Sequence, residues 1–110
     1  VLDGVRAVVQ RIQELSPQTT VLLLDIFPRG AGFNVDRGRI LQINQALARL
    51  HDGKRVVFLP IGHVFLEDDG SISPEIMPDA LHLTTQGYQR WHDAIDPTLQ
   101  SMLSDEKRKE

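Results

Sequence analysis

An aspartate and a histidine three residues apart, Asp79 and His82, are the side chains of this sequence best suited to chemistry. They stand in a segment rich in turn-forming residues, just before a predicted helix. At this spacing in a loop, the Asp79 carboxylate can meet Nδ1 of the His82 ring, fix its tautomer and leave Nε2 as a general base. The spacing by itself fits a solvated turn or a helix N-cap equally, so both interpretations stand at this point.

The other three histidines have structural explanations in the sequence. His51 falls at the end of a predicted helix, where a positive charge suits the helix dipole. His92 lies within a predicted helix and is expected to pack or to face solvent. His63 opens a loop after a predicted strand, so it either lines a substrate cleft or is an ordinary loop residue. The histidines lack the spacing of metal ligands, and the acidic run 67–69 is typical of a solvated loop face. No metal and no cofactor are therefore expected.

Arg29 directly follows a predicted strand, where its side chain can bind either the loop backbone or a substrate carbonyl. Gly30 and Gly32 do not form a phosphate-binding Gly-x-Gly-x-x-Gly element, which disfavours nucleotide binding. Tyr88 and Trp91 stand at helical spacing and are predicted to belong to the core.

The composition excludes several classes of protein. A chain of 110 residues is long enough for one small domain. Its net charge of −3 disfavours a nucleic-acid partner, because proteins that bind nucleic acids usually carry an excess of basic residues. The absence of cysteine excludes disulfides, thiolate metal sites and a cysteine nucleophile. No apolar run approaches the roughly 20 residues that span a bilayer, so no membrane span is expected.

Hydrophobic periodicity predicts two strands among three helices. The helices are expected at 1–15, 37–51 and 84–103, and the strands at 19–27 and 55–61. Asp36 is expected to cap the second helix, and Thr84 or Thr85 the third. The charged residues 104–110 are expected to form a frayed tail.

Strands that alternate with helices indicate βαβ units and a parallel sheet. Ligands of open α/β sheets bind beyond the carboxyl ends of the strands, here in the loops 28–36 and 62–83. Two strands are few for such a sheet, so at least one strand edge is expected to need a neighbour.

Longer motifs occur in one order along the chain. In the first half they are Phe27-Pro28-Arg29-Gly30, Asn34-x-x-Arg37 and Ile43-Asn44. In the second half they are Phe65-Leu66-x-x-Asp69-Gly70-Ser71-Ile72-Ser73 and Asp79-x-x-His82-Leu83-x-x-x-Gly87-Tyr88. Together they resemble the SGNH/GDSL serine esterases, in particular the platelet-activating-factor acetylhydrolase catalytic-subunit type, and cover about Gly4 to Leu103.

The resemblance implies an α/β fold, the C-terminal part of a three-layer α/β/α flavodoxin-like SGNH hydrolase. It implies that His82 is the catalytic base and Asp79 its orienting carboxylate. The substrate would be a small ester with a short acyl group, most simply acetyl, on a lipid or a carbohydrate.

The family's nucleophile lies in a Gly-Asp-Ser motif near its N-terminus, and that motif is absent here. Ser71 follows Asp69-Gly70 in a turn and is not expected to replace it. The family's oxyanion Gly and Asn also come from earlier loops, so residues 1–103 are expected to be the C-terminal half of the domain.

The chain would then need a missing N-terminal half or another copy of itself as a partner. The alternative is an inactive α/β module that forms a homo-oligomer, or docks to a partner chain, through an open strand edge.

Overall fold

The order of elements is helix, strand, helix, strand, helix, as the sequence predicts. The computed structural model describes residues 1–30, 32 and 34–109, with side chains described up to Ser104. The elements are α1 (Leu2–Leu15), β1 (Val21–Leu24), α2 (Val35–Leu47), the 3₁₀ turn η1 (Ala48–Leu50), β2 (Val56–Leu59), the 3₁₀ turn η2 (Gly62–Phe65) and α3 (Thr85–Lys109). In the loop 28–36, Ala31 and Phe33 lie outside the described residues.

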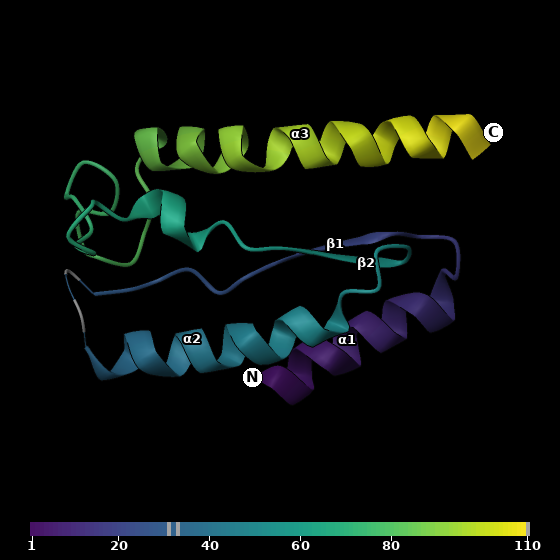
Figure 1. Cartoon of the computed structure of the whole chain (residues 1–110), viewed down its shortest axis with the longest axis horizontal. Helices are drawn as coiled ribbons and strands as arrows, with labels where there is room; N and C mark the ends of the chain where they lie inside the picture. Colours follow the sequence, from purple (N-terminus) through teal and green to yellow (C-terminus); the bar gives the residue numbers. More distant parts are fainter. Residues whose placement is uncertain (31, 33, 110) are drawn as a thin grey trace.

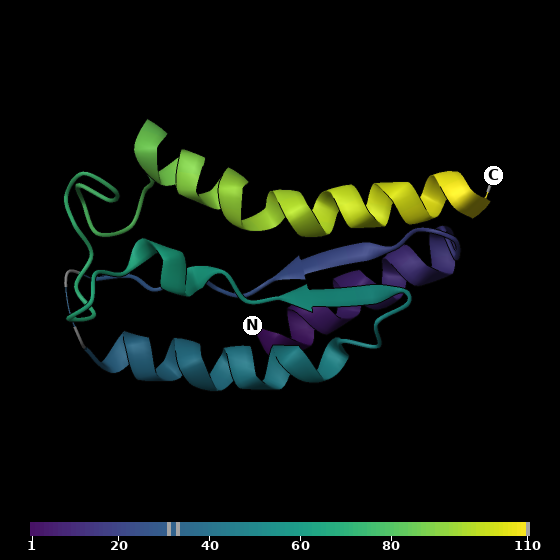
Figure 2. The ribbon, with the colours of Figure 1, turned by 45° about the horizontal axis from the view of Figure 1, so that its top comes forward.

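The two strands form a parallel sheet between two layers of helices. Val21 of β1 is in register with Val56 of β2, and Leu24 with Leu59. Helices α1 and α2 cover one face and α3 the other (Figure 1). Both strands point toward the same end of the molecule (Figure 2). The predicted α/β architecture with two parallel strands and three main helices is therefore confirmed.

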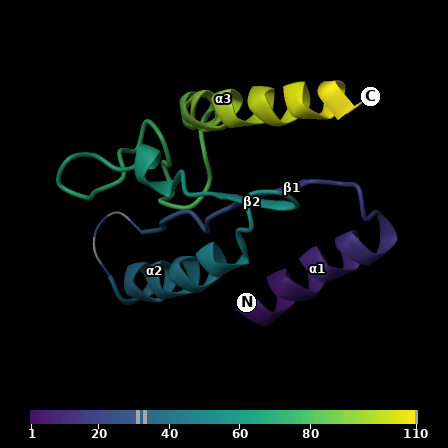
Figure 3. The same cartoon turned by 45° about the vertical axis from the view of Figure 1, so that its right-hand side comes forward.

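The segment between β2 and α3 folds over the ends of the strands and carries much of the core. Its buried side chains form one cluster, Phe65, Ile72, Ile76 and Met77. Phe27, Val64, Leu66, Leu83 and Trp91 pack against this cluster. Figure 3 shows the segment gathered at the end of the sheet where α2 begins. The stretch predicted as a long loop is thus a packed part of the fold.

The bounds of the central elements differ from the prediction. Helix α2 begins at Val35 because Asn34, rather than Asp36, is the N-cap: Asn34 Oδ1 accepts from the backbone N–H of Arg37 at 2.9 Å. Asp36 stands in the first turn instead. The α-helix ends at Leu47, and η1 replaces its last predicted turn. The ladder of paired residues is shorter than either predicted strand.

Helix α3 begins as predicted but extends further. Thr84 caps it, its Oγ1 accepting from the N–H of Gly87 at 3.1 Å. The helix runs past its predicted end at Leu103 to Lys109, so most of the predicted frayed tail is helical. The division into residues 1–103 and 104–110 stays a prediction.

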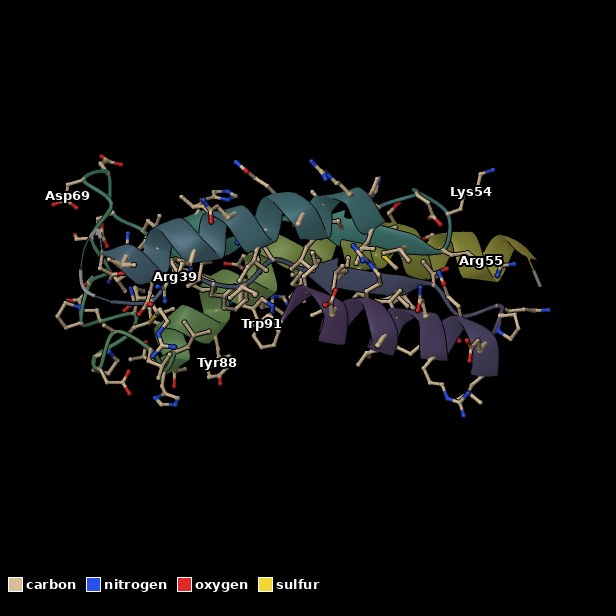
Figure 4. All side chains as sticks on the ribbon, turned by 90° about the horizontal axis from the view of Figure 1, so that it is seen from below. Arg39, Lys54, Arg55, Asp69, Tyr88 and Trp91 are labelled. Atoms are coloured by element: carbon tan, nitrogen blue, oxygen red, sulfur yellow. The ribbon has the colours of Figure 1, made fainter. Side chains whose placement is uncertain are left out.

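Tyr88 is not a core residue. It is 54% exposed, whereas Trp91 is half-buried against the core cluster. The two rings lie side by side along α3, with centroids 5.7 Å apart (Figure 4). The prediction for Trp91 holds and that for Tyr88 is wrong, because the Tyr88 ring lies beside Trp91 but stays more than half exposed.

β1 has one edge without a strand partner among the described residues. An apolar groove lies on each side of this strand. The groove of about 480 Å³ on the α1 side is lined by Val1, Gly4, Val5, Val8, Val9, Ile12, Val21 and Leu23. The groove of about 400 Å³ on the α3 side is lined by Gln18, Thr19, Thr20, Leu22, Leu99, Met102 and Leu103. The expected strand edge without a neighbour is present.

Across the described residues, no helix combines the length and the hydropathy that a bilayer crossing requires.

Candidate active site

Asp79 and His82 meet in one of the two arrangements that their spacing allows. Nδ1 of His82 lies 2.5 Å from Oδ2 of Asp79. The other oxygen, Oδ1, accepts from the backbone N–H groups of Leu81 at 3.0 Å and His82 at 2.7 Å. Three hydrogen bonds from one turn therefore orient this carboxylate. The His82 side chain is 78% exposed, which leaves the ring accessible to a reactant.

These bonds determine the charge on Asp79. The hydrogen bond from the His82 ring, followed by those from the backbone N–H groups of His82 and Leu81, holds the pKa of Asp79 well below its ordinary value. The carboxylate is ionised at neutral pH and can only accept hydrogen bonds. Nδ1 of His82 must therefore donate, and the neutral ring keeps its free electron pair on Nε2.

The backbone between the two side chains is held in an unusual conformation. Ala80 has a φ of +59°, in the left-handed region that a residue with a Cβ seldom adopts. Its N–H donates to the carbonyl of Met77 at 3.0 Å. Its carbonyl accepts from the N–H of Gly30 at 2.9 Å. The turn is thus fastened to the core cluster on one side and to the segment after β1 on the other.

The start of α3 is packed tightly behind this turn. The N–H of Thr84 donates to the carbonyl of Ile76 at 2.9 Å, and its hydroxyl donates to the carbonyl of Glu75 at 2.5 Å. A Cβ at Gly87 would lie 2.9 Å from the same carbonyl of Ile76, so only glycine permits this approach. The position of His82 is therefore set from both ends of the turn.

Two polar side chains align the segments that leave the strands, and the sequence did not reveal their roles. Asp25, directly after β1, accepts from the N–H groups of Ile61 at 2.8 Å and Gly62 at 3.1 Å. Asn44 on α2 accepts from the N–H of Ile26 at 2.8 Å and donates to its carbonyl at 2.9 Å. Asn44 belongs to the Ile43-Asn44 motif of the sequence, but its partner is backbone and leaves no sequence signal.

The other candidate residues are separate from the pair. His63 lines a groove of about 460 Å³ between α2 and β2, whose walls include Ile40, Leu41 and Phe58. His92 is exposed and lies 3.4 Å from Asp93. Within the described parts of the chain, no three His, Asp or Glu side chains gather as a metal site would require.

His51 is structural, but for a reason other than the predicted one. Its Nδ1 accepts from the N–H of Phe58 at 2.9 Å, which requires that nitrogen to carry no proton. The prediction that a positively charged His51 ring interacts with the helix dipole is therefore wrong.

The Arg29 side chain is exposed. The backbone carbonyl of Arg29, rather than its guanidinium, takes part in the hydrogen bonds of the loop, where it accepts from Arg37 Nε. Ser71 donates from Oγ to Asp69 Oδ1 at 2.6 Å, within the turn in which the sequence places it.

Comparison with known proteins identifies the same group that the motifs resemble. The model of the GDSL-like lipase/acylhydrolase family matches residues 1–90. Platelet-activating factor acetylhydrolase IB subunit alpha1 of Pongo abelii is 34% identical over 108 residues, which cover 97% of this chain and 47% of that protein. The chain thus spans about half the length of the curated relatives it matches.

Solved structures agree. A protein from Streptococcus pneumonia described as a candidate platelet activating factor superposes with a TM-score of 0.76 and 25% identity, over 89% of this chain and 50% of that one. The esterase domain of the zebrafish ZfL2-1 retrotransposon ORF1 protein gives a TM-score of 0.72 at 22% identity, over 90% of this chain and 56% of that one. At that identity the second likeness shows a shared fold.

Proposed function

The chain belongs to the GDSL-like lipase/acylhydrolase family, and we propose on this basis that His82 and Asp79 are the general base and orienting carboxylate of an ester hydrolase. The observation that carries the proposal is the 2.5 Å contact between Nδ1 of His82 and Oδ2 of Asp79. It leaves Nε2 as the basic atom on an exposed ring.

The reaction would proceed through an acyl-enzyme. Nε2 of His82 accepts the proton of a serine hydroxyl as its oxygen attacks the ester carbonyl, and Asp79 stabilises the imidazolium that forms. The imidazolium then gives this proton to the leaving alcohol. A water molecule next attacks the acyl-serine while His82 accepts a proton from it, and the imidazolium then returns this proton to the serine oxygen as the acid is released.

The serine would come from outside this sequence. The chain has no Gly-Asp-Ser motif, and the Ser71 hydroxyl is engaged with Asp69 in its own turn. The relatives contain about as much sequence again as this chain matches. We therefore assign the nucleophile and the oxyanion donors to that missing N-terminal half, and the base and carboxylate to this chain.

The substrate would be a short-acyl ester, with acetyl the acyl group suggested by the acetylhydrolase relatives. The alcohol would be part of a lipid or a carbohydrate. The reaction needs no cofactor, because the serine supplies the nucleophile, the histidine transfers the protons and the aspartate stabilises the imidazolium.

The test is p-nitrophenyl acetate hydrolysis by a chimera that places the unmatched half of a relative before Val1. We expect turnover in the chimera and at least about a hundredfold loss of kcat in His82→Ala, because a general base contributes that much or more. The chain alone should hydrolyse p-nitrophenyl acetate no faster than its own His82→Ala variant.

His92→Ala is the matched control, since this exposed histidine also stands beside an aspartate. It should retain the turnover of the chimera. A folded chimera that hydrolyses nothing, or that loses nothing in His82→Ala, would contradict the proposed function.

A second candidate function is association through the open edge of β1. The observation that favours it is the pair of apolar grooves on either side of that strand. A second copy of the chain would cover both grooves in a homo-oligomer, whereas in the assembled enzyme the missing half would do so. Sedimentation velocity of the chain alone distinguishes them: a concentration-dependent mass indicates the second copy.

A further inference from the structure

Arg37 is a buried charged residue that the reaction does not use. It lies in the first turn of α2 and is only 5% exposed. Its guanidinium donates from Nε to the carbonyl of Arg29 at 3.3 Å and from Nη2 to that of Gly30 at 3.0 Å. Nη1 donates to the carbonyl of Gly70. A buried charge is costly unless it is hydrogen-bonded, so these contacts help to stabilise it here.

The partners of Arg37 belong to both segments that follow the strands. Arg29 and Gly30 come after β1, whereas Gly70 lies in the turn after β2. That turn is closed by bonds from Glu67 N–H to the Ser71 carbonyl at 2.8 Å and from Gly70 N–H to the Glu67 carbonyl at 2.9 Å. A planar guanidinium can donate in several directions at once, so one side chain joins the two segments.

Gly30 connects Arg37 to the candidate active site. Its carbonyl accepts from Arg37, and its N–H donates to the carbonyl of Ala80, between Asp79 and His82. Gly30 has a φ of +86°, and a Cβ there would lie 2.1 Å from Nδ2 of Asn34. Glycine adopts this conformation without backbone strain, and its carbonyl then meets Arg37 while its N–H meets the turn.

The Ala80 contact matters because this residue has a left-handed conformation. Such a conformation is unfavourable for a residue with a Cβ. The bond from Gly30 helps to keep it. If the bond is lost, Ala80 can relax to a right-handed conformation, which turns the Asp79 carboxylate away from Nδ1 of His82.

We propose that Arg37 is a positioning residue for the His82–Asp79 pair and acts through Gly30 and Ala80, a role that rests on the proposed function because it takes His82 as the base. Arg37 touches neither side chain of the pair through the contacts described. Arg37 fixes the position of Gly30, and the N–H of Gly30 in turn holds Ala80 between Asp79 and His82.

The test reads the tautomer of His82 by ¹⁵N NMR of the full chain at a pH where the ring is neutral. In the wild type the proton should be on Nδ1. We expect most molecules of Arg37→Met to carry the ring proton of His82 on Nε2. We expect the same of Arg37→Lys, which keeps the charge but not the planar guanidinium. A purely structural role of Arg37 would not change the tautomer of a folded chain.

Asn44→Ala is the matched control. Asn44 also joins α2 to the segment after β1, but through Ile26 and not Gly30. This variant should lower the stability of the chain and leave the proton on Nδ1.

A folded Arg37→Met chain with the proton still on Nδ1 would overturn the inference. If neither Arg37 variant folds, hydrogen exchange of the wild-type Gly30 amide decides: slow exchange supports the bond to Ala80, and exchange at the rate of an open loop refutes the role. Neither readout needs esterase turnover. An inactive chimera would therefore count against the proposed function alone.

Discussion

Among the described residues, Asp52, Asp69 and Asp79 each accept several hydrogen bonds from their own turn, and Asp52 and Asp79 make the closest comparison. Asp52 Oδ1 accepts from the N–H groups of Lys54, Arg55 and Val56 at 2.8–2.9 Å. Asp79 uses the same arrangement but keeps Oδ2 for the ring of His82. The turn by itself is structural in both places, and the third bond, to a histidine, is what makes Asp79 a candidate for chemistry.

Asp79→Asn should give the wrong tautomer without removing the turn. The amide oxygen can still accept from the backbone, but the amide nitrogen donates and would favour a ring with its proton on Nε2. We expect kcat of the esterase chimera to fall by about 10²–10⁴-fold. Steady-state hydrolysis of p-nitrophenyl acetate measures it. Asp93→Asn, beside His92, serves as the control, and equal activity of the two variants would contradict the role of Asp79.

The lowered pKa of Asp52 predicts how the free energy of unfolding changes with pH. The backbone N–H of Val56, followed by those of Lys54 and Arg55, lowers the pKa of Asp52 to about 2 from an ordinary value of 3.8. A carboxyl with a lowered pKa in the folded state contributes stability above its ordinary value and loses it as the pH falls through the lowered one. The wild type should therefore lose its advantage over Asp52→Ala between about pH 4 and pH 2. Urea unfolding at pH 5 and pH 2.5 tests this, and a difference independent of pH would contradict it.

At the scale of elements, the two helices next to the site use glycine for different reasons. Gly87 lies in the first turn of α3, against the carbonyl of Ile76 and the side chain of Leu83. Gly38 lies in α2 with nothing within 4 Å of the position of a Cβ. The first glycine allows α3 to approach the site, whereas the second has no such contact.

Gly87→Ala should destabilise the chain by about 1–3 kcal/mol, because the added methyl meets a backbone carbonyl that cannot move freely. Gly38→Ala is the matched control and should stabilise it by about 0.5–1 kcal/mol, since alanine loses less entropy in a helix. The free energy of unfolding in urea measures both. Equal effects of the two substitutions would show that the packing of α3 on Ile76 is not tight.

The whole molecule is less compact than its length predicts. Its radius of gyration is 15.5 Å, against about 13 Å for a compact domain of this size. Its extents are 44 × 28 × 19 Å. Among the described residues the sheet has only two strands, each with one edge that lacks a strand partner, and apolar grooves lie on both faces of β1. The elongated shape is that of part of an SGNH hydrolase fold. In the proposed enzyme, the remaining half of the relatives' domain would bind at this edge.

Closing this edge should raise stability. We expect the esterase chimera to unfold at a higher temperature than the chain alone. Leu23→Glu, in the groove beside α1, should remove much of this gain because it places a charge in the interface. Val35→Glu, at the exposed start of α2 and outside the three grooves, is the control and should leave the gain intact. Differential scanning calorimetry compares them, and equal melting temperatures of chimera and chain would contradict the docking of the missing half.

The sequence by itself determined the order of the elements and the parallel sheet, and it offered the Asp79–His82 contact as one of two interpretations of their spacing. Each depends on short-range patterns: hydrophobic period in the helices and strands, and a turn that closes within four residues. It also predicted the open edge, because two strands cannot complete a parallel sheet. Where two local signals compete, as between Asn34 and Asp36 for the cap of α2, the sequence favoured the wrong one.

Only the tertiary structure decided what holds the pair in place. Arg37 reaches the carbonyl of Gly70, which is 33 residues away, and Gly30 reaches that of Ala80. Every residue carries a carbonyl, so a bond to the backbone leaves no mark in the side-chain pattern of its partner. Such contacts depend on which segments pack together, and packing is settled by the fold as a whole.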